Sequence, residues 1–363
     1  MYDYGWIAQA TDEVRGFLEE RARVMEIIQN LDEYIGLRFE VFDLQAEGFV
    51  DPENPTDGFM QLENHPLLKH PENALSKRAL ERYYYTINLF RFISRDFKSW
   101  HSGYPEYIFY VESNSILFQP QNFLQLYSNF LLACVKTRDK IGFYNTVEKY
   151  EKIIAHVPHE YAAHTAVMMS RKLDFHSETG EFKAGLIYYL ASSEEVTLWY
   201  DKLPQFSKEV LLMGWIRTLL ENMRFDVALD KIKLYHELDL NYSGSEYLVS
   251  RLFKSICHLE LQQYSLLDTE LRSIYRMLKK LQSMGPFESQ FLRFLGKLPQ
   301  AVNNKDVVPL LVNMRDELAE MAKDKSKNRI FEYFHIIPWL DSKIKSLPFH
   351  QMVTKYLIED NSI

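Results

Sequence analysis

An aromatic residue recurs along this chain at intervals of roughly forty residues. Each time, it stands where the second of two amphipathic helices is expected to begin. A period of this length, without glycine-rich loops or strand alternation, indicates stacked helical hairpins that bury their apolar faces against their neighbours. The recurring aromatic residues are Phe97, Phe143, Phe182, Phe225 and Tyr264.

The composition favours an all-α fold with a large core. Of 363 residues, only 13 are glycine and 13 are proline, while 47% are apolar and 14% are aromatic. Such a balance is typical of helical proteins and not of sandwiches or barrels. We therefore predict one α-solenoid of about five hairpins, with an N-terminal helical segment and a C-terminal helical cap.

The net charge and the cysteine content indicate which partners the protein can bind and in which cell compartment it works. The net charge of −8 argues against nucleic-acid binding, because phosphate recognition needs a concentrated basic surface. No window reaches about 18 uncharged apolar residues and no export signal opens the chain, so no membrane span is expected. Cys134 and Cys257 lie in apolar helical runs, as reduced buried thiols do. We predict a cytoplasmic protein.

Four regions follow from the pattern of apolar residues and prolines. Residues 1–50 read as one long helix, or as two helices in line that divide at Gly36. Residues 51–75 hold four prolines, which predict an ordered loop over the first repeat or a flexible linker. Residues 76–284 contain the hairpins, and residues 285–363 form a helical cap over the last hydrophobic face.

Several hairpins resemble tetratricopeptide repeats. Phe225, Ala228, Ile232 and Tyr235 keep the spacing of that family's second helix, in which a small residue lets the paired helix approach closely. The first helices depart from the family pattern, since Ile216 stands where glycine is usual and the repeats exceed about 34 residues. The same second-helix spacing is kept by Phe143, Thr146, Tyr150, Ile153 and Pro158, and by Tyr264, Leu267, Leu271 and Ile274.

Most of residues 60–345 also resembles a group of uncharacterised bacterial proteins, of the kind found in Bacteroidota, that are built of such repeats. The tetratricopeptide resemblance implies a scaffold that holds a protein or peptide partner in a concave groove, and not an enzyme. It further implies that first helices line the groove. The residues placed on or near that face are Arg82, Tyr85, Ser128, Arg217 and Glu221.

The run Tyr83-Tyr84-Tyr85 supports a partner-binding role for the part of this face that holds Arg82 and Tyr85. Three consecutive tyrosines on a helix cannot all point to the core, so at least one should be partly exposed. Tyrosine and arginine often anchor a partner, which favours Tyr85 together with Arg82. The alternative is that the extra ring packs under the proline-rich loop at 51–72.

No catalytic, cofactor or metal site is expected. His159, Glu160 and His164 resemble the zinc-protease helix, but histidines five apart differ by about 140° and face apart, whereas histidines four apart differ by about 40°. Cys257 and His258 are neighbours and point about 100° apart, so they form no dyad. Three alternatives to the scaffold stay open: a ligand-responsive regulator, an unrecognised hydrolase, and self-association through an exposed terminal helix.

Overall fold

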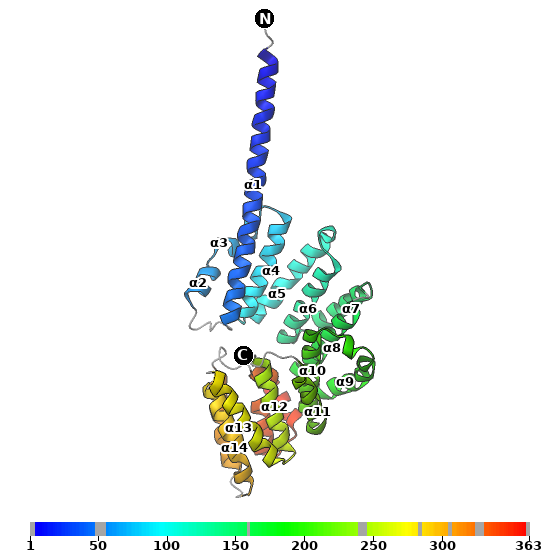
Figure 1. Cartoon of the computed structure of the whole chain (residues 1–363), viewed down its shortest axis with the longest axis vertical. Helices are drawn as coiled ribbons and strands as arrows, with labels where there is room; N and C mark the ends of the chain where they lie inside the picture. Colours follow the sequence, from blue (N-terminus) through cyan, green and yellow to red (C-terminus); the bar gives the residue numbers. More distant parts are fainter. Residues whose placement is uncertain are drawn as a thin grey trace. The chain divides into compact units, whose positions relative to one another are not determined.

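The computed structural model describes residues 4–47, 56–157, 160–238, 245–281, 285–303, 307–323 and 330–360. Within these residues the fold is all-helical, as the composition predicted, and no strand occurs (Figure 1). The chain divides into two compact units, Met1–Gln119 and Pro120–Ile363.

The first unit is built on a long N-terminal helix, α1, that packs along α4. This helix runs through Gly36 without a break, and a side chain there would meet no atom within 4 Å. Tyr34, Leu37 and Val41 recur at helical spacing on the face that is buried. The elements are α1 (Tyr4–Glu47), α2 (Asp57–Glu63), α3 (Pro66–Lys69), η1 (Pro71–Asn73), α4 (Lys77–Ile93), α5 (Phe97–Ser113) and η2 (Ser115–Leu117).

The described part of the proline-rich segment forms the short helices α2, α3 and η1 and packs on the first unit. The Phe59 ring stacks on Phe90 of α4, with 4.8 Å between ring centroids. The Asn30 side chain on α1 donates to the Asn73 carbonyl (3.1 Å) and accepts from the Leu75 amide (2.9 Å). Residues 56–75 are thus ordered against α1 and α4, and the earlier part of the segment lies outside the described residues.

The three consecutive tyrosines divide as their helical positions require. Tyr83 and Tyr84 are buried, and Tyr85 is partly exposed. The Tyr85 ring lies 6.5 Å from the Phe42 ring of α1 and 5.8 Å from the Arg38 guanidinium carbon. The prediction of one partly exposed ring is confirmed, and side chains of α1 lie against that ring.

The second unit begins with four helical hairpins whose two helices pack on each other. The second half of its central helix, α10, is buried on nearly every side because this helix packs against α8, α9, α11 and α12. The hairpin elements are α6 (Pro120–Thr137), α7 (Lys140–Ile154), α8 (Tyr161–Glu178), α9 (Phe182–Thr197), η3 (Tyr200–Lys202), α10 (Gln205–Glu221), α11 (Phe225–His236), α12 (Ser245–Glu260) and α13 (Tyr264–Leu281).

The recurring aromatic residues mark the second helices as predicted. Helices α5, α9, α11 and α13 begin at the aromatic residue itself, and α7 begins at Lys140, shortly before Phe143. The rings of Phe143, Phe182 and Phe225 are buried, which explains why an aromatic residue recurs there: it fills the space beside the hairpin turn.

The turn between the two helices has the same backbone in both units. In each turn one residue is left-handed: Arg95 (φ 57°), Arg138 (57°), Gly180 (72°), Met223 (58°) or Gln262 (56°). In the last turn, the Gln262 amide donates to the Leu259 carbonyl (3.0 Å) and the Gln263 amide donates to the His258 carbonyl (2.8 Å). This pattern is the Schellman motif, which satisfies the carbonyls at the end of a helix.

A glycine at one of these left-handed positions is expected to stabilise the fold. Gln262 is exposed, so Gln262→Gly relieves a left-handed backbone without loss of packing. We expect a gain of about 0.5–1 kcal/mol in the free energy of unfolding, measured by urea unfolding. Thr269→Gly, in the exposed middle of α13, is the control and should lose about 1 kcal/mol. A loss at both positions would contradict the motif.

After the hairpins the chain first extends the stack and then returns to it. Helix α14 packs on α13 and α12, α15 packs on α14, and α17 packs on α15 and α18. From Tyr333 onward the chain contacts α8 and α12 again, so this region does more than cap the last hairpin. The elements are α14 (Pro286–Asn303), α15 (Val307–Ala322), α16 (Ile330–Tyr333), α17 (Ile336–Lys345) and α18 (Phe349–Asp360).

Candidate partner-binding site

Three successive first helices of the second unit end in a glutamate. Glu178 is the last residue of α8, Glu221 of α10 and Glu260 of α12. Each precedes the left-handed residue of its turn by two positions, so the repeated turn gives the three carboxylates equivalent places. We call these three residues the glutamate row. Glu221 is buried and the other two are partly buried, so their charges need partners within the protein.

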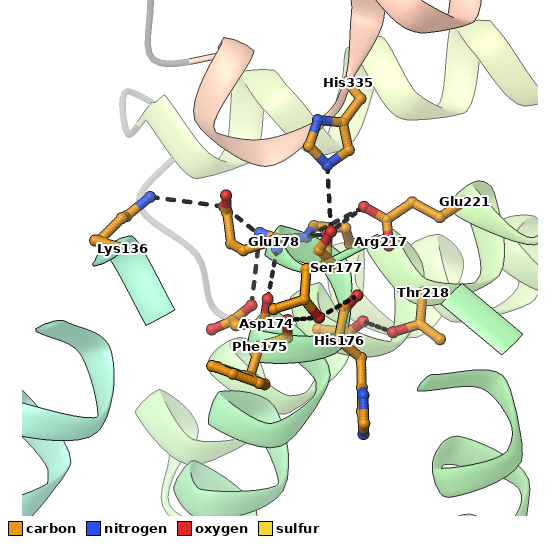
Figure 2. Close-up of polar contacts among 12 residues, drawn as sticks. Lys136, Asp174, Phe175, His176, Ser177, Glu178, Arg217, Thr218, Glu221 and His335 are labelled. Atoms are coloured by element: carbon orange, nitrogen blue, oxygen red, sulfur yellow. Dashed lines mark hydrogen bonds and ion pairs between the residues drawn. The ribbon is translucent and has the colours of Figure 1, made fainter. Parts of the chain in front are cut away.

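Arg217, one turn before Glu221 on α10, lies between Glu221 and Glu178 of the row (Figure 2). Its terminal nitrogens lie 3.6 Å from Asp174 Oδ1 and 3.6 Å from Glu178 Oε1, both on α8. Its Nε lies 3.5 Å from Glu221 Oε1 and donates to Ser177 Oγ at 2.8 Å. The planar guanidinium has donors in fixed directions, so one buried side chain links the ends of two helices.

The pKa values of Glu221 and Glu178 are shifted in opposite directions. Burial raises the pKa of Glu221 to about 7, although Arg217 and a hydrogen bond from Ser177 favour its charged form. Burial also acts to raise the pKa of Glu178, but the nearby charges of Lys136 and Arg217 outweigh it and hold that pKa below its ordinary value. Glu221 therefore titrates near neutral pH, while Glu178 stays ionised.

The C-terminal segment from Tyr333 to Lys345 contacts Glu260 of the row and the end of α8. On α17, Trp339 Nε1 donates to Glu260 Oε1 at 2.7 Å, and Lys343 Nζ lies 2.6 Å from the same oxygen. His335, just before α17, has its Nε2 3.4 Å from the Ser177 carbonyl oxygen at the end of α8, as Figure 2 shows. An indole and an ammonium one helical turn apart thus share one glutamate.

Aromatic side chains fix the same segment. The Trp339 side chain is fully buried. The Phe334 ring lies 6.0 Å from the Phe253 ring of α12, and the Phe349 ring stacks on Phe182 at 5.7 Å. Helices α8 and α12 therefore already hold a helical segment that comes from a distant part of the chain.

The five residues predicted for a groove fall into both units. In the first unit, Arg82 is partly buried and lies 3.5 Å from Glu81, and Tyr85 packs against α1. In the second unit, Ser128 on α6 is partly buried, whereas Arg217 and Glu221 are only 8% and 4% exposed. The structure brings Arg217 and Glu221 into contact with each other. They are covered because acidic residues of α8 surround Arg217.

Of the glutamate row, Glu221 alone was named from the sequence. The C-terminal residues that contact the row were not named. Glu178 and Glu260 share the register of Glu221, two residues before a left-handed turn, and that register was a usable signal. Asp174 was within reach as well, since it precedes Glu178 by one helical turn. His335 and Trp339 had no local signal, because their partners are far away in the sequence.

The other candidate chemistries have simple structural explanations. His164 is paired with Glu160 (3.1 Å between Nε2 and Oε2) and with the Tyr150 hydroxyl (3.2 Å from Nδ1), and His159 lies outside the described residues. Burial raises the pKa of the Cys134 and Cys257 thiols, which opposes thiolate formation.

Comparison with protein-family models, with curated proteins and with solved structures gives no significant match. Among the described helices, none combines the length and the apolar character that a membrane crossing requires.

Proposed function

We propose that this protein is a protein–protein interaction scaffold, an α-solenoid of about five degenerate tetratricopeptide-like hairpins that binds a helical segment of a partner. One observation supports this function: Glu260, one member of the glutamate row, already holds a helix, α17, through Trp339 and Lys343. A surface that holds a helix of its own chain has the shape and charge to hold a similar helix of another protein.

The contacts that α17 makes with the row indicate which side chains a partner helix needs. A matching helix carries an aromatic anchor, preferably tryptophan, and a basic residue one turn later, as Trp339 and Lys343 do. The acidic row favours the basic residue and disfavours an acidic one. We place this function in the cytoplasm, on the expectation that the buried thiols of Cys134 and Cys257 remain reduced.

A peptide supplied in trans tests the proposal. A fluorescent peptide of residues 330–349 should bind the Trp339→Ala chain with roughly micromolar affinity. It should bind the unsubstituted chain at least about tenfold more weakly, because the tethered segment competes at a high effective concentration. The same peptide with the Trp339→Ala substitution is the matched control and should not bind. If the Trp339→Ala chain is folded but does not bind the unsubstituted peptide, helix binding at the row is disproved.

A ligand-responsive regulator is the second candidate, and the presence of α17 on the row favours it. A partner that replaced α17 would free a helix that also packs on α15 and α18, so binding would change the C-terminal helices. Hydrogen exchange distinguishes the two candidates. Any occupant of the row displaces α17, so faster exchange that spreads to α15 and α18 on partner binding supports the regulator, and faster exchange confined to α17 supports the simple scaffold.

A further inference from the structure

The first half of α1 extends beyond the other helices of its unit (Figure 1). Its buried face, which includes Tyr34 and Leu37, packs on α4 only in the second half of the helix. On the opposite side, large apolar residues are exposed, and Val14, Phe17 and Ile28 are 59%, 71% and 54% exposed. Helical stability in proteins comes mainly from packing of an apolar face, so a helix of this length with such a face calls for a partner.

The exposed side follows a coiled-coil repeat. Its positions are spaced alternately four and three residues apart, the pattern of a heptad seam. At about 1.5 Å per residue the seam is about 38 Å long. Its members in chain order are Val14, Leu18, Arg21, Met25, Ile28, Asp32, Ile35 and Phe39, of which Ile35 is partly buried and the others are exposed.

The charged residues of this seam indicate which helix can pack against it. Arg21 and Asp32 are its only charged members, they have opposite signs, and both are exposed. In a parallel pair of α1 helices in register, Arg21 would face Arg21 and Asp32 would face Asp32. In an antiparallel pair centred between Met25 and Ile28, each Arg21 faces the Asp32 of the second copy.

The same antiparallel register matches every apolar position. Met25 faces Ile28, and the outer positions pair as Leu18 with Ile35 and Val14 with Phe39. In every pair the residue numbers have the same sum, as a two-fold axis perpendicular to the helix requires. This is the pairing of a positions with d positions that antiparallel coiled coils use.

We propose that the protein forms a homodimer through an antiparallel coiled coil of its α1 helices, with Arg21 of each copy paired to Asp32 of the other. The seam lies opposite the face that packs on α4, so each first unit keeps its own core. The interaction is separate from the glutamate row and holds whatever that row binds.

Charge reversal on the full-length chain tests both the interface and its direction, with sedimentation equilibrium at several concentrations as the measurement. The unsubstituted chain should be a dimer. Arg21→Glu and Asp32→Arg should each raise the dimer dissociation constant at least about tenfold, because each creates two like-charge contacts. The double variant Arg21→Glu/Asp32→Arg should recover the dimer. Arg23→Glu, on the side of α1 away from the seam, is the matched control and should leave the dimer unchanged.

A mixture of the two single variants tests whether each variant loses its dimer because of charge or because α1 no longer folds. The mixture should form a heterodimer, because Glu at position 21 then faces Arg at position 32 and Asp32 faces Arg21. A monomeric unsubstituted chain would overturn the proposal and leave the seam to a different protein. A dimer that tolerates both single reversals would place its interface elsewhere, and failure of the double variant to recover would exclude the antiparallel direction.

Discussion

Trp339→Ala is expected to lower the free energy of unfolding of the second unit by about 3–5 kcal/mol. The indole is fully buried, its ring lies 6.3 Å from the Phe334 ring, and its N–H donates to Glu260. The substitution leaves a cavity the size of an indole and removes a donor from a partly buried carboxylate. Urea unfolding followed by circular dichroism gives the magnitude.

Two further measurements locate this loss. Trp339→Phe keeps one aromatic ring but loses the N–H and part of the indole volume, so it should lose about 1–2 kcal/mol, less than the alanine variant. Hydrogen exchange in the alanine variant should rise in α17 and stay unchanged in α4 and α5, which belong to the other unit. A loss below 1 kcal/mol for the alanine variant would show that the segment is held by other contacts.

Much of the architecture was predictable because each hairpin repeats the same local chemistry. The aromatic residue that opens α9, α11 and α13 is visible in the sequence, and it marks the boundary to the residue. The turns before these helices were harder to predict. Only Gly180 signals its left-handed backbone, whereas Met223 and Gln262 adopt the same conformation without the residue type that usually reveals it.

In the candidate site, too, residues linked by local contacts could be predicted from the sequence, and residues linked by distant contacts could not. Arg217 and Glu221 were named because their register placed them on the first-helix face, and they lie one helical turn apart on α10. Their burial could not be predicted, because it depends on Asp174 of a neighbouring helix. Trp339 reads in the sequence as part of an irregular cap, since nothing local links it to Glu260.

The exposed side of α1 shows the opposite case. Val14, Phe17, Leu18, Met25 and Ile28 recur at helical spacing, and the sequence alone indicates a helix with an apolar side. The structure instead buries the face of Tyr34 and Leu37, so α1 has two apolar sides and only one of them is used within the unit. A periodic pattern predicts that a face is buried, but it does not say against which chain.

Arg217→Met is expected to destabilise the second unit by about 3–5 kcal/mol at pH 8. The substitution keeps much of the side-chain volume and removes the cation that lies between Asp174, Glu178 and Glu221. The three carboxylates then lose the one cation that they share, and Glu221 loses its counter-charge while Glu178 keeps Lys136 and Asp174 keeps Arg171. Arg217→Lys is the matched control: it keeps the charge but loses the planar fork, so it should lose less than half as much.

The pH dependence of the loss identifies the carboxylates as its cause. Glu221 has a folded pKa raised to about 7, so its contribution to stability is present below its ordinary value of 4.5 and is lost as pH rises through 7. Glu178 has a lowered pKa, so its contribution is present above its ordinary value and lost as pH falls.

Without Arg217, the pKa values of both carboxyls rise, since its charge lowers each of them. The deficit of Arg217→Met relative to the unsubstituted chain should therefore shrink by roughly 1–2 kcal/mol between pH 8 and pH 5. Urea unfolding at both pH values measures this difference. A deficit that stays constant with pH would mean that Arg217 stabilises the unit through packing of its alkyl chain, and that the charges of the row contribute little.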